Sequence, residues 1–123
     1  KKDRVDDAIH ATKAAIKEGI VPGGGVALLN AANSLSCKTE GEKIFIEAIK
    51  APYKTILNNA SISFEELNKK GWGINVVTGK PANMVKSGII DPVLVTKTAL
   101  KNAVSVATTI LSTDCVISNM REL

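Results

Sequence analysis

Three consecutive glycines, Gly23, Gly24 and Gly25, are the residues whose type and spacing best suit ligand binding. A backbone without side chains lets a ligand approach closely. The helix expected after Gly25 would also present free N–H groups and a positive dipole end to an anion. No Gly-Lys-Ser/Thr follows, so the run is not a Walker A phosphate loop. A tight turn between two helices explains the same spacing, and the run alone leaves both interpretations open.

Two carboxylates, Asp7 and Asp91, lie near the starts of expected helices. Asp7 follows Asp3 and Asp6 at the start of a helical stretch, where the pattern alone indicates a surface charge that complements the helix dipole. Asp91 precedes Pro92, which predicts an N-cap followed by the first residue of a helix.

Charge and composition argue against several classes of function. The net charge of +4 is mild. In the first helical stretch the basic residues Lys1, Lys2, Arg4, Lys13 and Lys17 are interleaved with acidic ones, and no aromatic side chains lie among them for bases to stack on, which disfavours nucleic-acid binding. Cys37, Cys115 and the single His10 have no zinc-ligand spacing, so two reduced cysteines in a cytosolic protein are expected. No run approaches the roughly 20 apolar residues of a membrane span, and no signal peptide opens the chain.

Apolar periodicity predicts a mainly α-helical chain with a little β-structure. The expected helices cover Val5–Ile16 with a stop at Gly19, Val26–Leu35, Glu42–Asn59, a short stretch opened by the capping-box residues Ser63 and Glu66 and ended by Gly71, and Val93–Leu111. Pro52 predicts a kink or two abutting helices within Glu42–Asn59. The inward face of that stretch should carry Ile44, Phe45, Ala48, Ile49, Tyr53, Ile56 and Leu57.

The β-structure is expected in two places. Residues Ile74–Thr78 are rich in β-branched side chains and precede the turn Gly79-Lys80-Pro81, which predicts a small hairpin. The alternating stretch Thr113–Ile117 predicts an edge strand whose partner need not lie in this chain. Ile20–Gly25 is expected to be a linker between two helices.

In combination, these motifs resemble the group I chaperonins, the GroEL/Hsp60 family. The resemblance rests on segments that follow one another in the family's order along essentially the whole chain: Arg4–Thr12, Glu18–Gly25, Ala51-Pro52, Gly73–Asn75, Asn83-Met84, Gly88–Pro92, Val95-Thr96, Ala99-Leu100 and Thr113–Val116. It implies that residues 1–19 end the intermediate domain and that residues 20–123 form the C-terminal half of the equatorial, ATP-binding domain.

The resemblance also implies roles for individual residues. Asp7 would activate the water that attacks the γ-phosphate of ATP, the step for which phosphoryl transfer needs an oriented nucleophile. The remaining matches are to nucleotide-binding positions: Gly23, Gly24 and Gly25 at the glycine turn, Asn75 and Val76 beside the adenine, Ile89 as an apolar contact to the base, and Asp91 at the ribose hydroxyls. Val76 stands where the family has a smaller residue.

The family's cofactors and partners follow from the same resemblance. ATP, Mg²⁺ and K⁺ are held in the family largely by a phosphate loop and aspartates that are not in this sequence, so the chain alone is expected to be inactive. The whole protein would assist folding of unfolded clients as a heptameric double ring with a co-chaperonin of the GroES/Hsp10 type. Its compartment would be the bacterial cytoplasm or an organelle matrix, with no nucleic acid or membrane partner.

Two other functions compete with this interpretation. One is a stand-alone α-helical protein-interaction module that binds no nucleotide. The other is a basic helical domain that binds nucleic acid, which salt-sensitive retention on heparin would support.

Overall fold

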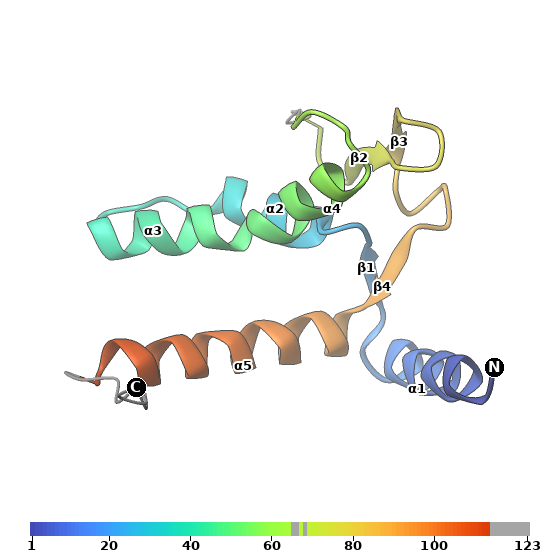
Figure 1. Cartoon of the computed structure of the whole chain (residues 1–123), viewed down its shortest axis with the longest axis horizontal. Helices are drawn as coiled ribbons and strands as arrows, with labels where there is room; N and C mark the ends of the chain where they lie inside the picture. Colours follow the sequence, from blue (N-terminus) through green and yellow to red (C-terminus); the bar gives the residue numbers. More distant parts are fainter. Residues whose placement is uncertain (65–66, 68, 114–123) are drawn as a thin grey trace, which may run out of the picture.

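The computed structural model describes residues 1–64, 67 and 69–113. Within these ranges the chain forms five helices and two pairs of short strands (Figure 1). The elements in chain order are α1 Lys2–Glu18, β1 Ile20–Pro22, α2 Val26–Ser34, α3 Glu40–Ile49, α4 Ala51–Asn59, β2 Trp72–Asn75, β3 Lys80–Asn83, β4 Ile90–Pro92 and α5 Val93–Leu111. The predicted mainly α fold class is confirmed.

The long helical stretch around Pro52 divides as predicted. α3 ends at Ile49 and α4 begins at Ala51, with Pro52 in its first turn, where proline's missing N–H costs no helical hydrogen bond. The start of α3 was expected two residues later. It begins at Glu40 because Thr39 and Glu42 cap it: Thr39 Oγ1 accepts from the Glu42 N–H at 3.2 Å, and Glu42 Oε2 accepts from the Lys38 N–H at 2.7 Å.

The expected linker after Gly19 is instead a strand. β1 pairs antiparallel with β4, in the register Ile20–Pro92, Val21–Asp91 and Pro22–Ile90. This pairing also makes the predicted N-cap role of Asp91 wrong. Asp91 is in the middle of β4, and the residue at the N-cap of α5 is Pro92, with no side-chain cap.

The predicted hairpin forms with shifted limits. β2 pairs antiparallel with β3, and the four-residue turn between them covers 76–79, so Val76 and Val77 lie in the turn despite their β-branched side chains. Asn75 decides this, because its carbonyl accepts from the Gly79 N–H at 2.7 Å and its side-chain Oδ1 accepts from the Val77 N–H at 3.0 Å.

A small core joins the hairpin to α2 and α4. Its fully or nearly buried members are Val26, Leu29, Tyr53, Leu57, Ile74 and Met84. Gly73 is part of this contact, because a Cβ there would lie 2.5 Å from Cγ2 of Val26. Of the residues predicted to face inward from α3 and α4, Ile49, Tyr53 and Leu57 are buried and Ile56 is half-buried, whereas Ile44, Phe45 and Ala48 are exposed.

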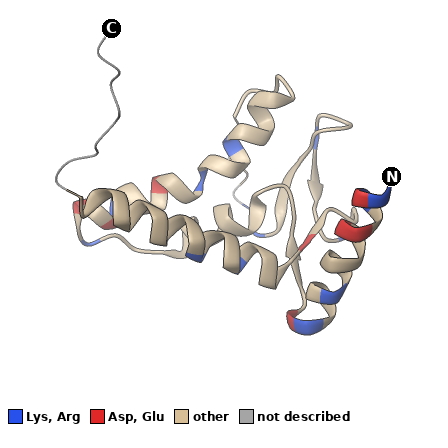
Figure 2. Ribbon diagram, turned by 60° about the horizontal axis from the view of Figure 1, so that its bottom comes forward, with Lys and Arg blue, Asp and Glu red and all other residues tan. Residues whose placement is uncertain are grey.

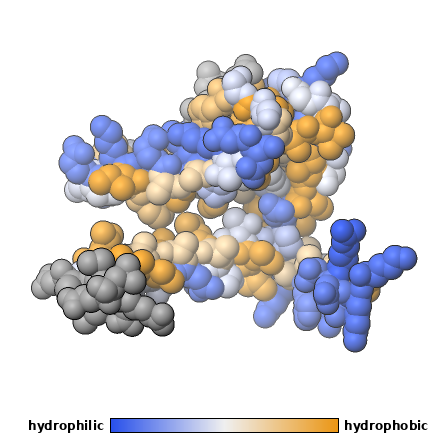
Figure 3. All heavy atoms as spheres, in the orientation of Figure 1, coloured by the Kyte–Doolittle hydropathy of each residue, from blue (hydrophilic) through white to orange (hydrophobic). Residues whose placement is uncertain are grey.

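α5 lies across from α2 and α3 in Figure 1, and it is the least buried of the helices. None of its residues is buried, and Figure 3 shows apolar side chains along it that border open space opposite α3. The large apolar residues exposed on it are Val95, Val104, Val106, Ile110 and Leu111.

Figure 2 shows charged residues spread along α1 and very few on α5. α1 and α5 are joined by an ion pair between Glu18 and Lys97 at 3.0 Å.

Two predicted elements lie partly or mainly outside the described residues. The short helix between Ser63 and Gly71 includes the undescribed positions 65, 66 and 68, and the described residues of this stretch are not helical. The edge strand Thr113–Ile117 lies beyond the described range except for Thr113. Within the part of the chain that is described, no helix has the length and apolarity needed to cross a bilayer.

We expect Gly25→Ala to destabilise the fold much more than Gly88→Ala. Both glycines have positive φ, +80° and +76°, so both substitutions carry the left-handed backbone cost of about 1–2 kcal/mol. A Cβ at Gly25 would also lie 2.6 Å from the Tyr53 nitrogen, whereas one at Gly88 meets nothing within 4 Å. The extra overpacking should add about 1–3 kcal/mol, measurable by urea denaturation. Equal losses for the two variants would contradict this packing.

We expect Thr39→Ala to cost about 0.5–2 kcal/mol in the free energy of unfolding, because it removes the cap of α3. Asp91→Ala should change stability by less than about 0.5 kcal/mol, since Asp91 is an exposed strand residue that caps no helix. Thermal unfolding of both variants tests the pair. A loss for Asp91→Ala as large as that for Thr39→Ala would restore its role as a cap.

Candidate functional site

The glycine turn joins β1 to α2 and is held against the segment that leads into β4. The Gly23 N–H donates to the Ile89 carbonyl at 2.8 Å, which extends the β1–β4 pairing by one hydrogen bond. Gly24 and Gly25 have φ of +68° and +80°, a conformation that residues with side chains rarely adopt. The turn therefore needs glycine at both positions to reverse the chain within three residues.

The space beside each glycine is occupied by the protein itself. A Cβ at Gly23 would lie 3.1 Å from the Ile89 carbonyl carbon, and one at Gly25 would lie 2.8 Å from the Tyr53 Cα. At Gly24 the obstacle is the Cε methyl of Met84, at 2.9 Å. Because glycine has no side chain, neighbouring segments pack closely against the turn. A ligand at this turn would therefore contact backbone peptide groups.

The peptide groups at this turn include those at the N-terminus of α2. Gly25 is the N-cap and supplies no side chain to accept from the first N–H groups of the helix. Uncapped N–H groups at a helix start carry partial positive charge and favour an anion or another acceptor. The turn therefore retains the anion preference that the sequence predicts for it.

The β1–β4 pairing brings three predicted site residues together. Gly23 is bonded to Ile89, and Asp91 lies two residues further along, paired with Val21. Asp91 is exposed, and within the described residues its carboxylate makes no hydrogen bond or ion pair. Ile89 is half-buried against the core. An apolar wall, a free carboxylate and the glycine turn thus share one short ribbon.

The hairpin carries the other two predicted binding residues, Asn75 at the end of β2 and Val76 at the start of the turn. Asn75 is half-buried and uses its side-chain oxygen to hold the turn, which leaves its NH₂ group as the donor that a ligand could use. Val76 follows it and is 41% exposed, so it offers an apolar surface and backbone polar groups. The hairpin reaches the glycine turn through Met84, which contacts Gly24 from the end of β3.

Asp7 is not joined to these residues. It is exposed on α1, and its side chain has no hydrogen bond or ion pair among the described residues. The helical rise places it about 18 Å along the helix axis from Gly19. Only Ala14 of α1 is buried, and the ion pair of Glu18 with Lys97 is solvent-exposed, so this helix is lightly held.

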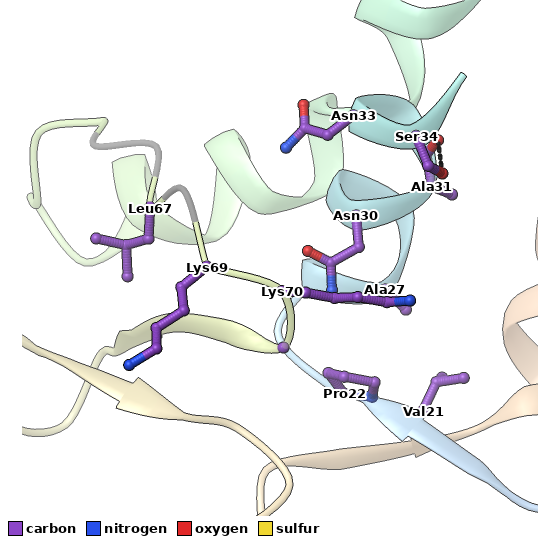
Figure 4. Close-up of a pocket in the computed structure, with 11 residues that line it drawn as sticks. Val21, Pro22, Ala27, Asn30, Ala31, Asn33, Ser34, Leu67, Lys69 and Lys70 are labelled. Atoms are coloured by element: carbon purple, nitrogen blue, oxygen red, sulfur yellow. Dashed lines mark hydrogen bonds between the residues drawn. The ribbon is translucent and has the colours of Figure 1, made fainter. Parts of the chain in front are cut away.

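A hollow beside the turn is lined by none of the predicted nucleotide contacts. It is an open groove of about 820 Å³ between β1, α2 and the segment before β2 (Figure 4). Polar groups of Asn30, Asn33 and Lys70 line it together with the apolar residues Pro22 and Leu67. His10 and Cys37 are exposed, and the described residues contain no cluster of His, Cys, Asp or Glu that could hold a metal ion.

Besides the strands β1 and β4, the sequence prediction missed the packing of Met84 and the capping pair of α3. Met84 was noted only as part of a motif, although it is 2% exposed and packs against Gly24. The alternation of apolar and polar residues near it gives no sign of a partner sixty residues away. The capping pair Thr39 and Glu42 has a readable Thr-x-x-Glu spacing that could have placed the start of α3.

Comparison with known proteins gives two findings. The sequence profile described as the TCP-1/cpn60 chaperonin family matches residues 1–121. A group III chaperonin, solved by crystallography in the open state, is similar in structure with a TM-score of 0.69 and 30% sequence identity. The match covers 85% of this chain and 25% of that chain, so this chain spans about a quarter of the length of that chaperonin.

Proposed function

Since this chain belongs to the TCP-1/cpn60 chaperonin family, we propose that it supplies the base and ribose side of an ATP site in a chaperonin subunit. The observation that carries the proposal is the β1–β4 ribbon. It aligns the glycine turn, the apolar side chain of Ile89 and the free carboxylate of Asp91. A nucleoside needs an apolar wall for its base and acceptors for its ribose hydroxyls, and this ribbon offers both.

Each binding residue has a role that fits its chemistry. The Asp91 carboxylate accepts from the ribose hydroxyls, and the Asn75 NH₂ donates to the edge of the adenine. Ile89 and Val76 cover the faces of the base. Gly24 presents its peptide to the nucleotide, and the uncapped start of α2 favours the acceptor oxygens nearby.

Asp7 is the proposed catalytic carboxylate. It would orient and activate the attacking water once α1 closes over bound ATP, since phosphoryl transfer depends mainly on positioning and charge. Closing would change the contact between α1 and α5 at Glu18 and Lys97, an exposed pair of the kind that contributes about 0.2–1 kcal/mol. Nucleotide contacts that differ between open and closed positions could therefore shift the population of α1.

We propose that residues 1–19 belong to an intermediate domain and residues 20–123 to an equatorial domain. The phosphates, Mg²⁺ and K⁺ would be held by other parts of the subunit. The finer assignment to group I rests on the motifs from Arg4 to Val116, while the similar solved structure is a group III protein. A heptameric double ring, a GroES-type co-chaperonin, unfolded clients and a cytoplasmic location belong to that finer proposal.

Asp7→Ala in the complete subunit should bind ATP with parental affinity and hydrolyse it about 10²–10⁴ times more slowly. Asp6→Ala is the matched control, because Asp6 is also exposed and occupies the neighbouring position of α1. The measurement is phosphate release together with calorimetric affinity. Turnover at the parental rate in Asp7→Ala, or equal losses in both variants, would show that the role given to Asp7 is wrong.

The chain alone should release no phosphate from ATP, because the residues proposed here contact the base and ribose but not the phosphates. Purified chain is assayed with Mg²⁺ and K⁺ present. Steady turnover that co-purifies with the chain through successive columns, and that Asp7→Ala abolishes, would show that the chain carries a complete site.

We also expect the chain alone to self-associate through the uncovered apolar face of α5. Large exposed apolar surfaces promote association, and Ile110 and Val106 are 56% and 60% exposed. Sedimentation velocity should show dimers or larger species that Val106→Lys and Ile110→Lys reduce. Val77→Lys is the control, since Val77 is 90% exposed on the hairpin turn instead. A monomer at every concentration, or equal effects of all three variants, would contradict this.

A further inference from the structure

The side chain of Met84 contacts two separate segments of the candidate site at once. Met84 ends the hairpin and is 2% exposed. Its Cε methyl lies against Gly24, since a Cβ built there would be 2.9 Å away, and its Sδ lies against Gly73, where the corresponding distance is 3.3 Å. The end of one side chain therefore fills the space between the glycine turn and the base of the hairpin.

The backbone of Met84 adds a second link to the same turn. Its N–H donates to the Gly71 carbonyl at 3.0 Å, and its carbonyl accepts from the Ile89 N–H at 2.9 Å. The Ile89 carbonyl in turn accepts from the Gly23 N–H at 2.8 Å. Met84 is thus connected to Gly23 through two successive hydrogen bonds and to Gly24 through its side chain.

We propose that Met84 is a positioning residue. It fixes the position of the Gly24 peptide group, which contacts the nucleotide. This role rests on the proposed function of the turn. Gly24 has a φ of +68° and no side chain of its own to fix it, so its position depends on what packs against it. Met84 occupies the side of Gly24 where a Cβ would stand, so a ligand would have to approach this peptide from another side.

The role predicts a specific change in binding. Met84→Ala removes the methyl and sulfur that support Gly24, so the dissociation constant for Mg-ADP and the KM for ATP in the complete subunit should rise about 10- to 100-fold, with kcat at saturation changing little. Met84→Leu keeps most of the volume and should fold, yet it lacks the unbranched reach to Gly24, so it should weaken binding by a smaller factor. Leu57→Ala is the control, since Leu57 is equally buried in the same core but is not among the atoms nearest to the three glycines.

A double-mutant cycle separates positioning from general stability. Gly24→Ala should weaken Mg-ADP binding at least about 3-fold less when combined with Met84→Ala than alone, because the obstructing methyl is then absent. This coupling, with near-parental binding in Leu57→Ala, supports the role. Additive effects of the two substitutions, or equal weakening of binding by Leu57→Ala and the Met84 variants, would overturn it. If Met84→Ala does not fold, the comparison of Met84→Leu with Leu57→Ala decides the same question. Absence of Mg-ADP binding in the parental subunit would overturn the proposed nucleotide site itself.

Discussion

The antiparallel pairing of β1 with β4 is the constraint on which the rest of the site depends. Each strand is three residues long, and the Gly23 N–H to Ile89 carbonyl bond extends the pairing into the glycine turn. The two strands are far apart in the sequence. β1 is followed by the glycine turn and α2, and β4 is followed directly by α5. By joining them, the ribbon sets where α2 and α5 begin and places Asp91 beside the glycine turn.

The glycines show how one sequence feature can serve packing and binding together. Gly25 is needed because the backbone of Tyr53 lies too close for a Cβ, and the backbone of Ile89 leaves little room for one at Gly23. Gly24 and Gly25 are also needed for their positive φ. A turn built this tightly keeps its peptide groups in a defined place, which is the property that a backbone-mediated binding site requires. The close packing interpretation and the ligand interpretation of the glycine run are therefore compatible.

The helices were predictable because their period is long enough to recognise, and Gly19 and Pro52 mark their limits well. The strands β1 and β4 were not, since three residues give no period and their pairing depends on a distant partner. Asp91 was misread as a cap for the same reason: Asp-Pro is a helix-start signal, and a tertiary contact overrode it. The site residues came from the order of motifs along the chain, which residue spacing alone could not have turned into nucleotide contacts. The exposed apolar residues of α3 and α5 show what periodicity cannot predict. An apolar stripe identifies one face of a helix, but it does not identify the segment that covers that face.

The central claim is that the β1–β4 ribbon holds the ribose of a nucleotide through Asp91. The most direct test is calorimetric binding of ATP and 2′,3′-dideoxy-ATP to the complete subunit and to its Asp91→Asn variant. A charge-assisted hydrogen bond contributes about 1.5–3 kcal/mol. The parental protein should therefore prefer ATP over the dideoxy analogue by about 10- to 150-fold, and Asp91→Asn should lose most of that preference. Equal preference in the two proteins would contradict a ribose contact at Asp91 and with it the placement of the nucleotide on this ribbon.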